Sequence, residues 1–326
     1  MERNITLDTI RDAAANVYQV ARRTPLIALD SASNSSTQTG TRIHLKLETL
    51  QPTGSFKIRG AYNAVRQLTP RELAHGVWTV SAGNAALGVA LAARSVGASC
   101  SVLVVDSAPQ TKLTGIERLG ATVIPVSYNE CWRVVAERDT ARLPGIFIPP
   151  FDDDAFMSGN GTIGLEIIED LPQVDTVIAS VGGGGLLAGV AAAMKALKPG
   201  VRIIAAEPES AAPLHTSFTR GEASRFEGWQ ASFVDGAGGQ TVTQTMWPLL
   251  RELVDESIVV SLDEVSEAMR ILATRAHLIA EGAGACALAA ALTGRAGNGP
   301  IAAIISGGNI DLAVFTDLVT HPATRR

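Results

Sequence analysis

The segment GSFKIRG, residues 54–60, places Lys57 at the start of a helix predicted over residues 57–67. The helix dipole disfavours a cation at this end. Most lysines in such positions simply reach solvent. A lysine that is buried beside a bound phosphate instead has a lowered pKa, and its neutral amine can form a Schiff base with a carbonyl group. Lys57 is therefore a candidate nucleophile and base.

Four consecutive glycines form the second feature that could do chemistry. They follow the apolar segment VDTVIASV and precede an alanine-rich helix predicted over 186–197. Successive glycine N–H groups can point into one concavity at the positive end of a helix, so the turn predicts a site for a single phosphate. A dinucleotide site is the competing interpretation, with Glu207 as a weak match to a ribose ligand, but the spacing is not G-x-G-x-x-G. The turn consists of Gly182, Gly183, Gly184, Gly185 and Leu186.

Two polar turns also follow apolar segments. In SAGNA, residues 81–85, Ser81 and Asn84 either cap the helix predicted over 85–96 or help backbone N–H groups to hold a substrate carboxylate. The turn SGGN begins at Ser306, after the segment IAAII, and by itself indicates only a change of direction.

Short apolar segments alternate with helical patterns over most of the chain, which predicts an α/β fold with parallel sheets covered on both faces. In such sheets ligands bind beyond the carboxyl ends of the strands, where the polar turns lie. Residues 211–245 are interpreted as a long functional loop plus short pieces of structure, and residues 144–161 as a crossing between two lobes. The predicted strands are 43–47, 77–80, 101–105, 121–126, 174–181, 203–206 and 301–306, and the predicted helices are 57–67, 85–96, 110–119 and 186–197.

Composition argues against several classes of function. The 326 residues are 46% apolar and 18% charged with a net charge of −5, which indicates a folded protein that does not bind nucleic acid. No apolar run is long enough to span a membrane, and the charged N-terminus is unlike a secretion signal. The three cysteines lack disulfide or metal-ligand spacing, so we predict a cytoplasmic protein without a metal site.

As an ordered set, the motifs SFKIRGA, SAGN, GNGTIGLEI, GGGGL, EGAGA and SGGN resemble those of fold-type II pyridoxal-phosphate enzymes, in particular the threonine/serine dehydratase branch that includes serine racemase. The resemblance extends from Thr24 to Leu312. It implies two lobes, each with a mostly parallel sheet flanked by helices. The large cofactor-binding domain would comprise residues 1–64 and 153–326, and the small domain residues 65–152. Pyridoxal 5'-phosphate as cofactor, a small amino acid as substrate and a homodimer are also implied.

The resemblance implies a role for each matching residue. Lys57 would hold the cofactor as a Schiff base and act as the base at the substrate Cα, while Phe56 would pack against the cofactor ring. Asn84 would hydrogen-bond the ring hydroxyl, and Ser306 would face the pyridine nitrogen. Residues 182–186 would bind the phosphate, with Gly236 and Glu281 near the ring. The substrate carboxylate would be bound by Ser81, Ala82, Gly83, Asn84 and Ala85.

The implied reaction is loss of water from a β-hydroxy amino acid to give a 2-oxo acid and ammonia. A serine beside the pyridine nitrogen makes the ring a weaker electron sink than a carboxylate would, which favours elimination. Serine racemases carry a second serine at the position of Ala82, and alanine cannot transfer a proton, so racemisation is disfavoured. Ala85 and Leu87 replace a histidine and a polar residue of the family motif. This change either predicts a bulkier substrate, such as a phenylserine, or is neutral.

Several alternatives remain open from the sequence. A β-replacement enzyme shares the fold but usually has SVKDR-like and GTGGT-like loops. An NAD-dependent oxidoreductase would hold no chromophore, and an inactive binding protein would not need Lys57, Asn84 and Ser306 together. Some relatives bind a divalent cation through a glutamate that matches Glu207. Pro213 stands where a second acid would be, so Glu207 is expected to cap or pair locally.

Overall fold

Six strands form the larger of two sheets in the computed structural model, which describes residues 3–29, 42–108 and 110–320. Their order is β1-β2-β10-β7-β8-β9, and all neighbours are parallel except the β1–β2 pair. The central strands are buried along their whole length, as expected for a parallel sheet covered on both faces. The strands are β1 (Leu26–Ala28), β2 (Ile43–Leu47), β7 (Thr176–Ser180), β8 (Arg202–Pro208), β9 (Glu256–Val260) and β10 (Ile301–Ile305).

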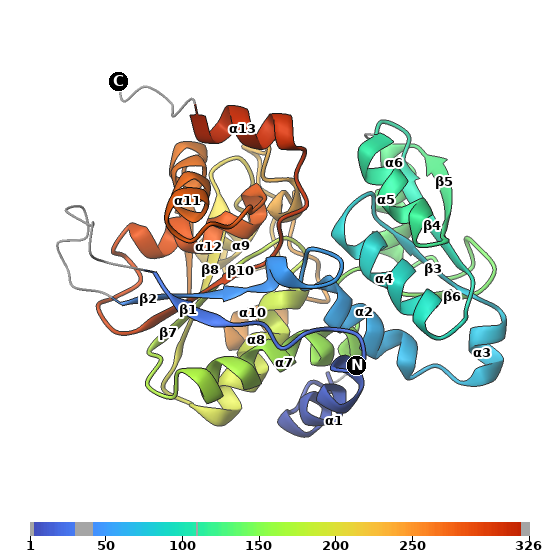
Figure 1. Cartoon of the computed structure of the whole chain (residues 1–326), viewed down its shortest axis with the longest axis horizontal. Coiled ribbons are helices and arrows are strands. Elements are labelled where there is room, and N and C mark those ends of the chain that lie inside the picture. Colours follow the sequence, from blue (N-terminus) through green and yellow to red (C-terminus); the bar gives the residue numbers. More distant parts are fainter. Residues whose placement is uncertain (1–2, 30–41, 109, 321–326) are drawn as a thin grey trace.

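Helices cover both faces of this sheet (Figure 1). Successive strand residues point to opposite faces, so Val177 packs in one core cluster with α7, α8 and α10, whereas Ile178 packs in another with α11, α12 and α13. Helix α1 lies against α7, and α9 lies against β9. The helices are α1 (Leu7–Val17), α7 (Asp154–Asp170), α8 (Gly185–Leu197), α9 (Pro213–Arg220), α10 (Trp247–Leu253), α11 (Leu262–Arg275), α12 (Gly282–Leu292) and α13 (Leu312–Thr320), with short 3-10 turns at η1 (Glu48–Leu50) and η2 (Asp235–Ala237).

The second lobe is built on four parallel strands in the order β5-β4-β3-β6. Val102 and Val104 face a core shared with α2, α4 and α5, and Trp78 and Leu103 face α6 on the other side. Helix α2 (Lys57–Arg66) packs against both α4 of this lobe and α7 of the large lobe. The other elements of the second lobe are α3 (Pro70–Ala74), β3 (Val77–Val80), α4 (Asn84–Ser95), β4 (Cys100–Val105), α5 (Gln110–Arg118), β5 (Thr122–Val126), α6 (Tyr128–Glu137) and β6 (Ile146–Phe147).

Every strand and helix predicted from the sequence is present within a few residues, and the predicted two-lobed α/β architecture is confirmed. The interpretation of residues 144–161 as a crossing is wrong at both ends, because Ile146–Phe147 form β6 of the small-lobe sheet and α7 begins at Asp154. Its glycines argued against a helix. They are needed because a Cβ at Gly159 would lie 2.5 Å from the Arg59 carbonyl oxygen, and one at Gly164 would lie 2.8 Å from the Ala193 Cβ. Residues 211–245, predicted as a long loop with short pieces of structure, contain α9 as one such piece.

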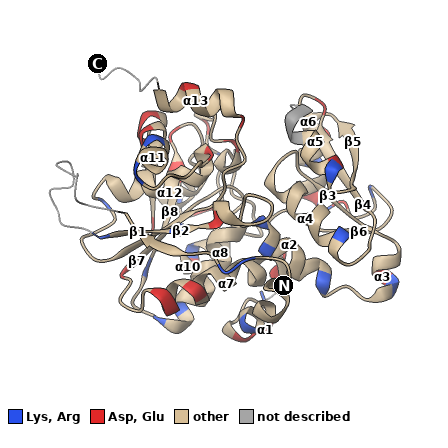
Figure 2. Ribbon diagram, viewed as in Figure 1, with Lys and Arg blue, Asp and Glu red and all other residues tan. Residues whose placement is uncertain are grey.

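Charged side chains of both signs are interspersed along the outer helices (Figure 2). Within the described residues, no helix combines the length and the apolar composition needed to cross a membrane.

Candidate active site

The Lys57 segment, the glycine turn and the SGGN turn meet at one edge of the large sheet because they follow β2, β7 and β10, which are parallel and end there. The segment after β2 is tied to the turn after β10. Phe56 N donates to the Ser306 carbonyl oxygen at 3.0 Å, and Gly308 N donates to the Gly54 carbonyl oxygen at 2.9 Å. Lys57, the first residue of α2, is thereby held beside the SGGN turn.

The Lys57 amine is surrounded by protein although the residue as a whole is partly exposed. Its Nζ donates a 2.6 Å hydrogen bond to the Pro150 carbonyl oxygen and lies 5.2 Å and 5.5 Å from the ring centroids of Phe56 and Phe156. Loss of water around the amine lowers the pKa of Lys57 to about 8, and the Glu281 carboxylate opposes this shift. A substantial fraction of the amine is therefore neutral, and so nucleophilic, at mildly alkaline pH.

Asn84 connects the two lobes at the site. Its Nδ2 donates to Glu281 Oε1 at 2.6 Å, and its Oδ1 accepts from Asn309 Nδ2 at 2.7 Å, which fixes the orientation of the amide. A Cβ at Gly307 would overlap with Glu281 Oε1. Only glycine therefore leaves room for the Asn84–Glu281 pair. One Nδ2 hydrogen of Asn84 remains for a ligand in this geometry.

The glycine turn joins β7 to α8, and Gly184, with φ of 90°, is the N-cap of that helix. A Cβ at Gly182 would lie 2.7 Å from the Gly236 carbonyl oxygen, and one at Gly183 would overlap with the Phe151 ring. A Cβ at Gly185 would lie 2.6 Å from the Phe151 carbonyl oxygen. Close packing on several sides thus requires glycine here, and the turn presents main-chain N–H groups at the start of a 13-residue helix.

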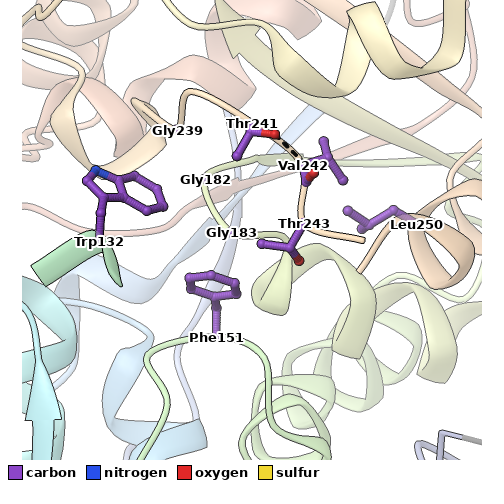
Figure 3. A pocket seen from close by; sticks show the side chains of 9 residues that line it. All are labelled: Trp132, Phe151, Gly182, Gly183, Gly239, Thr241, Val242, Thr243 and Leu250. Carbon is purple, nitrogen blue, oxygen red and sulfur yellow. Dashed lines mark hydrogen bonds between the residues drawn. The ribbon is translucent and has the colours of Figure 1, made fainter. Parts of the chain in front are cut away.

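A small cavity adjoins this turn at the boundary between the lobes (Figure 3). The Phe151 ring points from the crossing segment toward Gly183, and the Trp132 indole comes from α6 of the small lobe. The cavity is lined by Trp132, Phe151, Gly182, Gly183, Gly239, Thr241, Val242, Thr243 and Leu250. It borders the glycine turn, and Lys57 is not among its lining residues.

Ser306 directly follows β10 and is 3% exposed. Its Oγ is 3.4 Å from Ser180 Oγ and donates to the Ala283 carbonyl oxygen at 3.5 Å. Gly236 lies on the same side, since a Cβ there would be 2.9 Å from the Ala283 Cβ and 3.9 Å from Glu281 Oε1. The hydroxyl of Ser306, the carboxylate of Glu281 and the backbone of Gly236 therefore gather near Lys57.

The SAGNA turn starts α4 opposite these groups. Gly83 N donates to Ser81 Oγ at 3.1 Å, and a Cβ at Gly83 would meet no atom within 4 Å, so the turn borders open space. Ala82 is partly exposed, whereas Ala85 is 3% exposed and packs inward. The Leu87 side chain points toward α5, because its Cδ2 lies 3.3 Å from the position that a Cβ on Gly115 would occupy.

Glu207 lies away from this group and is fully buried. Its carboxylate accepts 2.8 Å hydrogen bonds from the N–H groups of Leu214 and His215 at the start of α9, and another from the Ser257 hydroxyl. Burial raises the pKa of Glu207, although these hydrogen bonds act to lower it. The Glu207 carboxylate thus caps the start of α9, which agrees with the local capping expected from the sequence. Among the described residues, no three His, Cys, Asp or Glu side chains are grouped as metal ligands.

Four residues near Lys57 and the glycine turn were not predicted from the sequence: Pro150, Phe151, Phe156 and Asn309. A backbone carbonyl such as that of Pro150 has no side-chain signature. Asn309 ends the SGGN turn, and its two hydrogen bonds, to Asn84 Oδ1 and to the Thr53 carbonyl oxygen at 2.7 Å, explain why an amide is required there.

Comparison with known proteins is consistent with this arrangement. Residues 17–307 match the model of the family described as pyridoxal-phosphate dependent enzyme. The chain is 40% identical over 318 residues to L-threonine ammonia-lyase of Thermotoga maritima, covering 97% of this chain and 78% of that protein. It is 37% identical over 323 residues to the catabolic L-threonine dehydratase TdcB of Staphylococcus aureus, covering 97% and 92%.

Solved structures give the same result for the fold. Maize serine racemase superposes with a TM-score of 0.87 at 33% identity, covering 96% of both chains. The processed form of threonine deaminase isoform 2 from Solanum lycopersicum superposes with a TM-score of 0.85 at 33% identity, covering 97% of this chain and 90% of that one.

The fold and the site thus define a cofactor-dependent enzyme of the fold-type II class. The chain belongs to the family of pyridoxal-phosphate-dependent enzymes, and within it to the lyases that act as amino-acid dehydratases or ammonia-lyases. The predicted family, cofactor and enzyme class are confirmed, and the NAD-dependent alternative is wrong.

The residues present fit pyridoxal phosphate. The glycine turn offers N–H groups where a side chain would collide with neighbours. Lys57 offers an amine with a lowered pKa. Ser55 Oγ, beside Lys57, is fully buried and has no hydrogen-bond partner among the described residues. A buried hydroxyl without a partner is costly, which is consistent with a bound group that the chain alone does not supply.

Proposed function

We propose that the enzyme removes water from a β-hydroxy α-amino acid of the threonine or serine type, and that hydrolysis of the resulting enamine releases a 2-oxo acid and ammonia. The observation that carries this proposal is the Lys57 amine, which has a pKa near 8 and lies between the glycine turn, the SAGNA turn and Ser306. The names of the relatives from Thermotoga maritima and Staphylococcus aureus support threonine as a substrate.

In the proposed site, Lys57 holds the cofactor covalently and Phe56 packs against its ring. Asn84 donates to the ring hydroxyl, and Ser306 faces the pyridine nitrogen. Gly236 and Glu281 lie near the ring, and the main chain of residues 182–186 binds the phosphate. The substrate carboxylate is held by the turn of Ser81, Ala82, Gly83, Asn84 and Ala85, with Ala85 contributing its backbone because its side chain is buried.

When bound, pyridoxal phosphate withdraws electrons from the substrate Cα and makes the Cα proton acidic. Lys57 Nζ, freed from the cofactor when the substrate amine takes its place, would accept this proton, since its lowered pKa leaves it a competent base near neutral pH. The Phe56 and Phe156 rings keep water from the amine. The resulting Lys57 ammonium is placed to return a proton to the departing β-hydroxyl. The N–H groups of the SAGNA turn keep the substrate carboxylate fixed during this exchange.

Racemisation is the alternative reaction to consider, because maize serine racemase is among the structural neighbours. It requires a second acid on the opposite side of the substrate from Lys57. Ala82 occupies the corresponding position of the SAGNA turn and has no ionisable group. Elimination is therefore the better-supported outcome.

A bulkier substrate, such as a phenylserine, is the second candidate within the same reaction. The open space beside Gly83 favours it. The burial of Ala85 and the direction of Leu87 toward α5 weaken it, because neither side chain borders that space. We therefore propose threonine and serine, rather than a bulkier amino acid, as the preferred substrates.

The assembly and location of the enzyme are part of this proposal. We expect a homodimer in the cytoplasm, with residues 1–64 and 153–326 forming the cofactor-binding domain and residues 65–152 the small domain. Light scattering of the purified protein measures the mass, and a monomer would contradict the expected dimer.

The test of the function has two steps. Purified protein should be yellow, and borohydride should reduce the cofactor onto the peptide that contains Lys57. A panel of L-threonine, L-serine and phenylserine isomers is then assayed for ammonia and 2-oxo acid. A colourless protein that cannot be reconstituted would overturn the cofactor site, whereas a yellow protein that releases no ammonia would overturn only the reaction. Phenylserine turning over faster than threonine would reverse the order of substrates.

A further inference from the structure

The glycine turn has no side chains of its own, so its shape depends on the residues packed around it. Phe151 borders it on one side, where a Cβ on Gly183 would overlap with the ring. Met246 and Leu250 border it on another side, where a Cβ on Gly184 would lie 3.2 Å from Met246 Cε and 2.8 Å from Leu250 Cδ1. The turn therefore lies between two walls that are far apart in the sequence (Figure 3).

Asp152 joins these two walls. It directly follows Phe151, and its Oδ2 accepts a 2.6 Å hydrogen bond from the hydroxyl of Thr245, the residue before Met246. Arg3 reinforces the junction, because its guanidinium donates to Asp152 Oδ1 and, at 3.1 Å, to the Thr245 carbonyl oxygen. The Asp152 side chain is only 10% exposed, and a charge-assisted hydrogen bond in such a setting is stronger than a neutral one at the surface.

The segment that carries this carboxylate also contacts the reactive lysine and the small lobe. Pro150, two residues before Asp152, supplies the carbonyl oxygen that accepts from Lys57 Nζ. Arg138 of the small lobe places Nη1 3.7 Å from Asp152 Oδ2. Arg138 ends α6 in the left-handed conformation, with φ of 51° and ψ of 48°, which is uncommon for a residue with a side chain. Residues 150–152 are thus fixed to both lobes while they contact Lys57 and the glycine turn.

We propose that Asp152 is a positioning residue that shapes the phosphate-binding turn by holding the Phe151 and Met246 walls together, with Thr245 and Arg3 as its partners. This inference rests on the proposed phosphate site at residues 182–186. It assigns Asp152 no contact with the cofactor or the substrate. Residues that orient a binding site in this way affect ligand affinity without taking part in the reaction.

Binding of pyridoxal phosphate to the apoprotein tests the proposal without reference to activity. Asp152→Ala should raise the dissociation constant, measured by absorbance titration, by about tenfold or more, in the range found for supporting residues around bound metals. Thr245→Val removes only the hydroxyl and should give a smaller rise. Asp154→Ala is the matched control, because Asp154 also accepts from Arg3, at 2.9 Å, and carries the same charge but does not bond to Thr245. It should bind like the wild type.

Melting temperatures of the apoproteins separate positioning from a general loss of structure. The proposal stands if Asp152→Ala and Thr245→Val weaken binding while their melting temperatures stay near that of Asp154→Ala. If Asp152→Ala does not fold, Thr245→Val decides. Unchanged or tighter binding in a folded Asp152→Ala or in Thr245→Val would overturn the positioning role while leaving the proposed function intact. Failure of the wild type to bind would instead overturn the phosphate site and this inference with it.

Discussion

Asn84 and Glu281 connect the small lobe to the large lobe through a 2.6 Å hydrogen bond from Nδ2 to Oε1, next to Lys57. Each residue lies at the N-terminal end of a helix, Asn84 in α4 and Glu281 before α12. Burial lowers the pKa of Lys57, and the Glu281 carboxylate opposes this larger effect by raising it. A contact between the lobes therefore influences the charge of the reactive lysine.

The first prediction concerns the pH at which the apoprotein takes up pyridoxal phosphate. Only the neutral Lys57 amine can attack the aldehyde, so the rate of Schiff-base formation should rise about tenfold per pH unit well below pH 8 and level off above it. Glu281→Gln removes a charge that favours the ammonium, so the midpoint should move to lower pH. Stopped-flow absorbance measures the rate.

Glu267→Gln is the control for this prediction, since Glu267 pairs with Arg270 on α11 away from the site. Its midpoint should equal that of the wild type. A Glu281→Gln profile that coincides with the control would mean that the carboxylate does not act on Lys57.

The second prediction concerns the stability of the apoprotein. The pKa of Lys57 is about 8 when folded, against an ordinary value of 10.5, so folding holds a charged amine in an unfavourable setting at pH 7. Lys57→Met should therefore raise the melting temperature at pH 7 by about 2–5 °C while abolishing activity. The penalty is fully present below pH 8 and fades as pH rises to 10.5. The advantage of methionine should shrink over the same range.

Calorimetry at pH 7 and pH 10 measures this difference. Lys198→Met, at the C-cap of α8 away from the site, is the control and should show no such pH dependence. An advantage of Lys57→Met that is equal at both pH values would point to packing rather than charge.

The fold and the side-chain part of the site could be predicted from the sequence for identifiable reasons. Buried strands such as residues 301–305 are continuous apolar runs, and a strand-to-helix turn rarely needs four glycines in a row unless the backbone approaches a ligand. The supporting contacts were not predictable, because they depend on tertiary distance. Lys57 and Pro150 are 93 positions apart, and Asp152 and Thr245 are also 93 apart. Asp152 moreover stands in a run of three aspartates that resembles an ordinary helix start.

The third prediction concerns a buried ion cluster two residues beyond Lys57. The Arg59 guanidinium donates to Glu48 at 2.8 Å and to Glu166 at 2.6 Å, and Glu166 also pairs with Lys46 at 2.6 Å, with all four side chains fully buried. Arg59→Met leaves two buried carboxylates with one cation. The free energy of unfolding should fall by about 3–5 kcal/mol, as measured by urea denaturation.

An exposed pair provides the comparison. Arg23 is 45% exposed and pairs with Asp170 at 2.6 Å, so Arg23→Met should cost no more than about 1 kcal/mol. A similar loss in the two variants would indicate that burial does not strengthen the role of Arg59.

The fourth prediction concerns the choice between elimination and racemisation. Elimination needs one base at the substrate Cα, whereas racemisation needs a second acid on the other side. Ala82, partly exposed in the SAGNA turn, supplies none. Ala82→Ser introduces a hydroxyl at this position. With L-serine, the ratio of D-serine formed to ammonia released should therefore rise by at least about tenfold, because acid–base groups typically contribute 10²- to 10⁴-fold when well placed.

Chiral chromatography and an ammonia assay on the same samples give this ratio. Ala82→Val, which adds bulk without a proton donor, should lower both products and leave the ratio unchanged. Equal ratios in Ala82→Ser and Ala82→Val would show that a hydroxyl at this position cannot reach Cα. An increase confined to Ala82→Ser would identify the missing proton donor as the feature that restricts this enzyme to elimination.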